Sequence, residues 1–117
     1  MAERLCSSIW RLAEMACIFH RHVRESALSR EQASRLHRAF RADVEKGVWI
    51  LSPITESFLR RLGTAMEKAP AELLLRAGDA VHLVSARDAG FAEIWTSDRR
   101  LLAAAAYFDL NGRSVSA

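Results

Sequence analysis

Short apolar runs alternate with longer helical patterns along this chain, and that alternation limits the folds open to it. Val48-Trp49-Ile50-Leu51 and Glu93-Ile94-Trp95-Thr96 have the length and apolar character of brief strands. The segments around them repeat apolar residues at helical spacing. Helices that alternate with short strands predict an α/β fold with a parallel sheet. At 117 residues, we expect a single domain over 1–117.

Two helices are expected in the N-terminal half. The segment 5–8 reads as the end of a short strand, and Ser7 or Ser8 is a natural N-cap for a helix that runs to about Arg24. The second helix opens at Ser29, in a capping box with Gln32, and stops at Gly47. The expected inward residues are Ile9, Leu12, Ala16, Phe19 and Val23 in the first helix, and Ala33, Leu36, Ala39 or Phe40, and Val44 in the second.

The C-terminal half predicts three further helices. Thr55 or Ser57 begins a helix that ends near Pro70, and Asp98 begins the last one. Between them we expect a short helical turn over 71–75 and a helix over 79–89. The inward residues of the helix before Pro70 are expected to be Phe58, Leu59, Leu62, Ala65 and Met66. After Gly112 the pattern leaves open whether the tail adds a strand.

Composition indicates in which cellular compartment the chain is expected. The longest apolar stretches, 12–19 and 80–86, are far shorter than the roughly 18 residues of a membrane span, and the first residues do not read as a secretory signal. We therefore expect a cytoplasmic protein with no membrane contact. Cys6 and Cys17 lie in apolar surroundings typical of buried, reduced thiols.

The net charge of +3 favours an anionic partner. Fifteen of the seventeen basic residues are arginine, whose planar fork suits phosphates and carboxylates. A GC-rich genome produces the same bias without any function, and both explanations stay open.

Three carboxylates stand out by their surroundings. Glu14 has only apolar neighbours in 12–19, which places it at a desolvated surface or pairs it with Arg11 or Arg21 at a helix edge. Asp79 and Asp98 each precede a helical pattern, where an N-cap role would also explain an acid. If the three acids converge at the carboxyl ends of parallel strands, they offer the oxygen ligands that Mg²⁺ and Mn²⁺ prefer.

His82 follows Asp79 by three residues, one helical turn later. At that spacing it could orient Asp79 or meet a phosphate. A partly buried, hydrogen-bonded histidine is the alternative role.

Two motifs resemble a known family. The segment 78–86 reads Gly-Asp-Ala-Val-His-Leu-Val-Ser-Ala, and 95–101 reads Trp-Thr-Ser-Asp-Arg-Arg-Leu. Together they closely resemble the C-terminal half of PIN-domain proteins, in particular VapC-type toxins of toxin–antitoxin pairs. Upstream, Ser7-Ser8 followed by Ala13-Glu14 is similar to the family's strand-and-helix motif with a metal-binding glutamate. The resemblance runs from about Leu5 to Asn111.

The resemblance implies a PIN-like, three-layer α/β/α fold in which Glu14, Asp79 and Asp98 are the catalytic and metal-binding acids. The family's first acid, an aspartate that ends an N-terminal strand, has no counterpart in this sequence. We therefore expect an N-terminally truncated PIN-like domain whose N-terminal strand is missing. Such a chain would cleave RNA poorly or not at all.

The implied activity is that of a Mg²⁺- or Mn²⁺-dependent endoribonuclease acting on transfer or ribosomal RNA. Arg21, Arg24, Arg99 and Arg100 are the expected phosphate-binding residues. The expected partners are a cognate antitoxin and a second copy of the chain in a homodimer. The alternative is a non-catalytic PIN-fold remnant that serves as an antitoxin-binding or dimerisation module.

Overall fold

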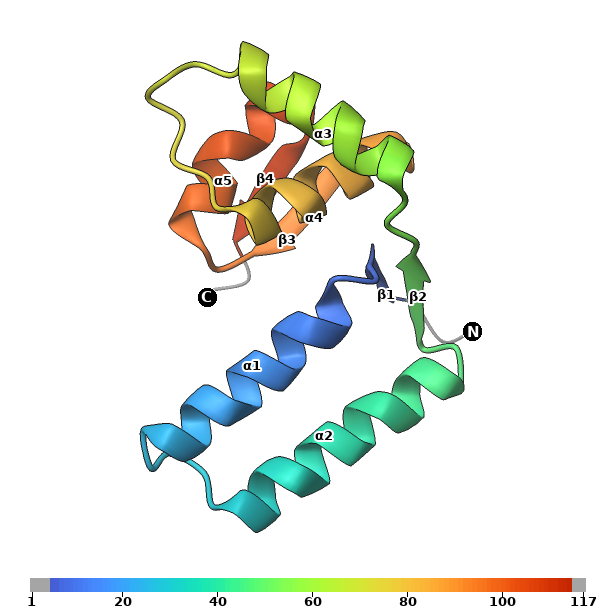
Figure 1. Cartoon of the computed structure of the whole chain (residues 1–117), viewed down its shortest axis with the longest axis vertical. Coiled ribbons are helices and arrows are strands. Elements are labelled where there is room, and N and C mark those ends of the chain that lie inside the picture. Colours follow the sequence, from blue (N-terminus) through green and yellow to red (C-terminus); the bar gives the residue numbers. More distant parts are fainter. Residues whose placement is uncertain (1–4, 115–117) are drawn as a thin grey trace. The chain divides into compact units, whose positions relative to one another are not determined.

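The structure is a computed structural model that describes residues 5–114, and it is mostly helical with short parallel strands (Figure 1). In chain order the elements are β1 (Leu5–Ser8), α1 (Arg11–Arg24), α2 (Arg30–Glu45), β2 (Trp49–Ser52), α3 (Glu56–Lys68), α4 (Ala77–Asp88), β3 (Glu93–Thr96), α5 (Arg99–Ala105), the 3₁₀ turn η1 (Ala106–Phe108) and β4 (Asn111–Ser114). The expected α/β class is therefore confirmed. No helix within residues 5–114 is both long and apolar enough to cross a bilayer.

The chain folds as two compact units, the N-terminal unit Met1–Ser52 and the C-terminal unit Pro53–Ala117. Each unit contains one pair of parallel strands. β1 pairs with β2, with Leu5 opposite Trp49, and β3 pairs with β4, with Glu93 opposite Asn111. The expected short parallel sheet is thus present as two two-stranded sheets over the described residues.

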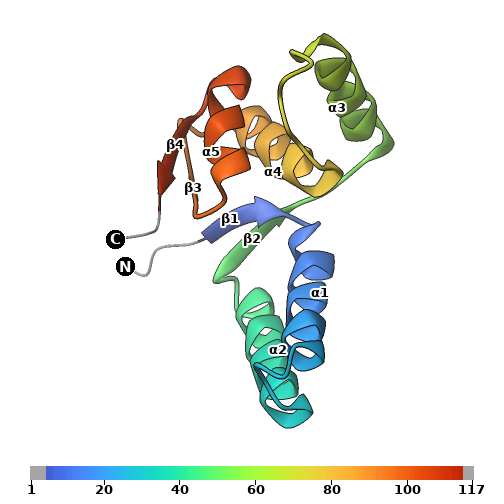
Figure 2. The ribbon, with the colours of Figure 1, turned by 90° about the vertical axis from the view of Figure 1, so that its left-hand side faces the viewer.

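In the N-terminal unit, α1 and α2 follow β1 and precede β2 in sequence, and they form a helical hairpin that extends away from the paired strands (Figures 1 and 2). The capping box is confirmed: Ser29 Oγ accepts the Gln32 N–H at 3.1 Å, and Gln32 Oε1 accepts the Ser29 N–H at 2.9 Å. Gly47 ends the α2 segment with a φ of +78°, a conformation that costs glycine little. These local signals fix both ends of α2.

Several expectations for the N-terminal unit are wrong. Ser8 does not cap α1, because its hydroxyl accepts the Trp10 N–H at 2.9 Å in the turn before the helix. Leu12 is exposed, and no residue of α1 is fully buried. Cys6 and Cys17 are free thiols but exposed rather than buried. Leu12 and the two cysteines are exposed because this unit has a small core, whose buried apolar residues among 5–52 are Ala33 and Phe40.

The C-terminal unit contains the main core. Six consecutive residues of α4, from Ala80 to Ser85, are buried, so this helix is covered on all sides. It contacts α3, α5, β3 and η1, and Figure 2 shows it between α3 and α5. Leu83 and Val84 of α4 and Phe108 of η1 have no exposed surface. The central position of α4 fixes the start of this helix, where Asp79 lies.

The C-terminal unit differs from the sequence-based expectations in burial and in the bounds of its elements. Leu59 is half exposed rather than inward, because α3 buries a narrow stripe centred on Phe58. The short helical turn expected over 71–75 is one hydrogen-bonded turn, closed by the Leu73 N–H on the Pro70 carbonyl. α4 begins at Ala77, two residues earlier than expected. The tail does add a strand, where Gly112 packs so closely on Leu102 that a Cβ atom would lie 3.0 Å from a side-chain carbon.

Candidate functional site

Asp79 lies in the first turn of α4, three residues after the N-cap Arg76. Its Oδ2 atom accepts the backbone N–H of Arg76 at 3.3 Å. The N-cap interpretation of Asp79 is therefore wrong: Arg76 is the N-cap, and Asp79 stabilises the helix start from the first turn. Only Oδ2 takes part in this hydrogen bond, which leaves Oδ1 as a possible ligand atom.

Asp98 is the N-cap of α5, as the capping interpretation expected. Its Oδ1 atom accepts the N–H groups of Arg100 at 2.8 Å and Leu101 at 3.4 Å. The Asp98 N–H in turn donates to the Thr96 hydroxyl at 3.0 Å. The helix start thus holds this carboxylate through one oxygen, Oδ1, and Thr96 at the strand end holds the Asp98 backbone.

Glu14 lies in the first turn of α1, and its side chain is 28% exposed. It forms an ion pair with Arg11, which also donates to the Ser7 hydroxyl at 3.3 Å and lies 5.7 Å from the Trp49 ring. Of the two partners considered from the sequence, Arg11 pairs with Glu14. The partly desolvated position expected for Glu14 is present as well.

His82 and the four arginines fall at different depths. His82 is buried, with 8% of its surface exposed, which agrees with the expectation of a partly buried histidine. Arg21 and Arg24 are exposed in the last turn of α1, and Arg99 and Arg100 are exposed at the start of α5. All four guanidinium groups can therefore reach an anion in solvent.

The acids expected to form one metal site come from both units. Asp79 and Asp98 belong to the C-terminal unit, at the starts of two helices that contact each other, and Glu14 belongs to the N-terminal unit. Over residues 5–114, no three His, Cys, Asp or Glu side chains gather as a metal-binding group. The shared three-acid site stays a prediction.

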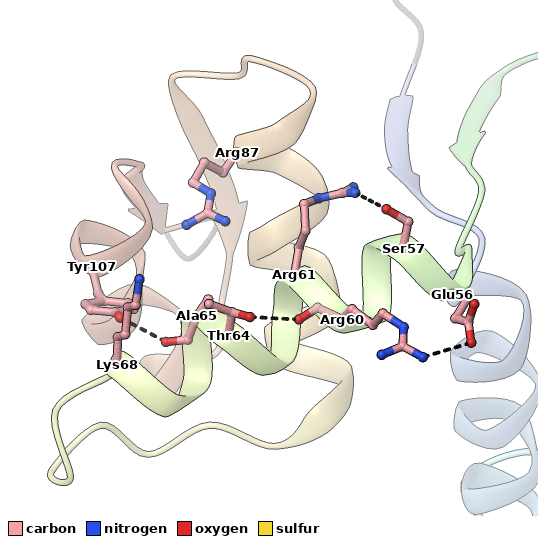
Figure 3. Close-up of a pocket in the computed structure, with 9 residues that line it drawn as sticks. All are labelled: Glu56, Ser57, Arg60, Arg61, Thr64, Ala65, Lys68, Arg87 and Tyr107. Atoms are coloured by element: carbon pink, nitrogen blue, oxygen red, sulfur yellow. Dashed lines mark hydrogen bonds and ion pairs between the residues drawn. The ribbon is translucent and has the colours of Figure 1, made fainter.

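A basic groove in the C-terminal unit was missed by the sequence analysis. It has a volume of about 700 Å³ and is lined by Arg60, Arg61 and Lys68 of α3 and by Arg87 of α4 (Figure 3). We call this cavity, with its four cationic residues, the basic groove. A signal was present, because at 3.6 residues per turn the three cations of α3 fall within about 100° around the helix axis. The contribution of Arg87 depends on how α3 packs against α4.

The chain was compared with known protein families, curated proteins and solved structures. The PIN domain profile matches residues 1–107, which include Glu14, Asp79 and Asp98. Neither the curated proteins nor the solved structures gave a match. PIN domains are nuclease-type domains that typically use divalent metal ions. The match covers most of both compact units, and the chain therefore belongs to the PIN domain family.

Proposed function

We propose that this chain is a Mg²⁺- or Mn²⁺-dependent endoribonuclease of the VapC-like toxin type. The observation that carries the proposal is the PIN domain match over residues 1–107, which spans all three acids nominated from the sequence. The positions of Asp79 and Asp98 at helix starts support it, because backbone N–H groups fix one oxygen of each carboxylate. A carboxylate held in this way needs little reordering to bind an ion.

The donor set suits a hard divalent cation. Glu14, Asp79 and Asp98 offer carboxylate oxygens, the ligands that Mg²⁺ and Mn²⁺ take together with water. In Asp79 and Asp98 the described hydrogen bonds engage Oδ2 and Oδ1, respectively, so the second oxygen of each is the proposed ligand atom. The ion pair with Arg11 holds the Glu14 side chain against the surface of α1.

The chemistry that a bound divalent ion supplies here is the conversion of a water molecule to hydroxide near neutral pH. Attack by that hydroxide would form the bond from its oxygen to phosphorus and break the bond to the ribose oxygen, which would leave with the proton released from the water. Arg99 and Arg100, next to Asp98 in the chain, hold the flanking phosphates, as do Arg21 and Arg24. These arginines offset the repulsion between the acids and the phosphate.

The rest of the proposal concerns partners. We propose a cognate antitoxin, transfer or ribosomal RNA as the substrate, a homodimer, and a cytoplasmic setting. The positive net charge of +3 is compatible with RNA binding. Glu14, Asp79 and Asp98 give the antitoxin a negatively charged site that a cationic side chain can block.

The test uses the whole chain with transfer RNA and ribosomal RNA in Mg²⁺, in Mn²⁺ and in EDTA. Asp98→Asn keeps a capping side chain but removes the charge. Asp109→Asn is the matched control, because Asp109 is exposed and has a φ of +60°, which asparagine tolerates. Because the family's first acid has no counterpart here, we expect weak metal-dependent cleavage by the parent chain and by Asp109→Asn, and none by Asp98→Asn. Cleavage that persists in EDTA, or a parent chain without metal-dependent cleavage, would overturn the proposal.

A further inference from the structure

We propose that the basic groove binds the phosphate backbone of single-stranded RNA, as a contact surface separate from the three acids. This inference rests on the proposed ribonuclease function and names an additional place where the substrate is held. The groove lies wholly within the C-terminal unit, on α3, the end of α4 and η1. Arg60, Arg61, Lys68 and Arg87 are not among the four arginines nominated from the sequence.

The charge of the groove favours a polyanion. Four cationic side chains face two carboxylates, Glu56 in the lining and Asp88 beside it, so an excess of two positive charges remains. Arginine supplies three of the four cations, and its planar fork matches phosphate oxygens. The groove therefore has both the sign and the donor chemistry of a phosphate-binding surface.

Two of the guanidinium groups are already held in place. Arg61 donates to the Ser57 hydroxyl at 2.8 Å and to Asp88 Oδ2 at 3.1 Å, and it lies 5.9 Å from the Phe58 ring. Arg87 lies 5.7 Å from the Phe108 ring and 3.8 Å from Asp88. Because both side chains are already ordered, a ligand that meets them causes a smaller loss of side-chain entropy.

The other two cations are available for exchange. Arg60 pairs with Glu56 at 3.3 Å, but the two side chains are 78% and 83% exposed. Such an exposed pair contributes little, so a phosphate can replace the Glu56 carboxylate. Lys68 lies in the last turn of α3 and lines the groove (Figure 3). Arg60 and Lys68 are thus the residues whose loss should affect binding without affecting the fold.

The shape of the groove favours an extended strand. From Ser57 to Lys68 the lining follows one face of α3 for about 16 Å, at 1.5 Å per residue. The hydroxyls of Ser57 and Thr64 lie along the same face, and hydroxyls are common partners of backbone phosphates. Tyr107 donates its hydroxyl hydrogen to the Ala65 carbonyl at 2.9 Å, which ties η1 to α3 along the groove.

The first experiment measures binding of a fluorescent oligouridine, which has little structure of its own, in EDTA so that no cleavage occurs. Arg60→Gln/Lys68→Gln is compared with the parent chain over a range of salt concentrations. Arg35→Gln/Arg38→Gln is the matched control, since it removes two exposed cations from α2. We expect the groove variant to bind roughly tenfold more weakly at 0.1 M salt, with a salt slope smaller by about 1.4, because each phosphate contact contributes about 0.7. Equal affinities and slopes for the groove variant and the parent would overturn the proposal.

The second experiment looks for a gain that misfolding cannot produce. Glu56→Gln releases Arg60 and removes one negative charge from the groove, and we expect oligouridine to bind about two- to threefold more tightly. Glu31→Gln is the control, because Glu31 occupies the first turn of α2 as Glu56 occupies the first turn of α3. An equal gain in both variants would contradict a groove-specific site.

Failure of the groove can be distinguished from failure of the ribonuclease. If binding depends on Arg60 and Lys68 but the parent never cleaves RNA, the groove stands and the ribonuclease proposal fails. If cleavage depends on metal and Asp98 while both groove variants bind as the parent does, the groove fails alone. Binding of polyglutamate that depends on Arg60 and Lys68, with oligouridine binding unchanged, would assign the groove to an acidic polypeptide and overturn the RNA proposal.

Discussion

The Oδ2 atom of Asp79 accepts the backbone N–H of Arg76 at 3.3 Å, three residues earlier in the chain. An asparagine oxygen can accept the same hydrogen, so we expect Asp79→Asn to change the free energy of unfolding by no more than about 1 kcal/mol, mostly through the lost charge near the helix start. If Asp79 binds the metal, the asparagine variant has no negative charge to offer the ion, and we expect its Mn²⁺ affinity to be at least about tenfold lower than that of the parent chain. Calorimetric titration and thermal melts measure both quantities. Unchanged Mn²⁺ affinity with a melting temperature lower by several degrees would show a purely structural role.

Asp98 allows capping and chemistry to be separated by two substitutions. Asp98→Ala removes the acceptor of the Arg100 and Leu101 N–H groups and should lower the free energy of unfolding by about 1 kcal/mol, whereas Asp98→Asn keeps an acceptor. We expect both variants to lose metal-dependent cleavage and only the alanine variant to lose stability in urea unfolding. Equal cleavage by the parent chain and Asp98→Asn would remove Asp98 from the site.

Leu83 has no exposed surface in the middle of α4, whereas Leu74 is 70% exposed. We expect Leu83→Ala to lower the free energy of unfolding by about 2–5 kcal/mol, because it leaves a cavity in the main core. The matched control Leu74→Ala should change it by less than about 0.5 kcal/mol. Urea unfolding followed by circular dichroism measures both, and similar losses in the two variants would contradict the described packing.

The capping box of α2 gives a prediction for the N-terminal unit. Ser29→Ala removes the acceptor of the Gln32 N–H and should lower the free energy of unfolding by about 1 kcal/mol. Ser34→Ala makes the same chemical change inside the same helix, where alanine is a better helix former, and it should not destabilise the chain. Urea unfolding followed by circular dichroism measures the free energy of unfolding of both variants. A more stable Ser29→Ala variant would contradict the cap.

The sequence predicted those parts of the fold that depend on neighbouring residues. The Ser29–Gln32 capping box, the Thr55 cap of α3 and the Asp98 cap of α5 are formed by side chains that bond to backbone groups within three residues. Strand and helix order follows from the same local patterns. Boundaries failed where tertiary packing decides, as at Ala77, where α4 starts earlier than its acid indicated.

Burial was harder to predict than secondary structure. Leu12 and Leu59 follow helical spacing, yet 40% and 50% of their surface is exposed, because spacing shows which face is apolar and not whether that face is covered. The acids Asp79 and Asp98 were nominated from their places before helical patterns and from the family motifs that surround them, and their role stays a prediction. The basic groove was missed because Arg87 joins the cations of α3 only through the packing of α4 against that helix.

The continuous burial of α4 also affects how the molecule opens. Amide hydrogens exchange with solvent when a segment opens locally, and segments with many buried contacts open least often. α4 is buried over six consecutive residues, and α1 has no fully buried residue. Exchange should therefore be slowest in α4 and faster in α1. Under mild denaturation, the helix that carries Asp79 should keep its structure after the helix that carries Glu14 has begun to unfold.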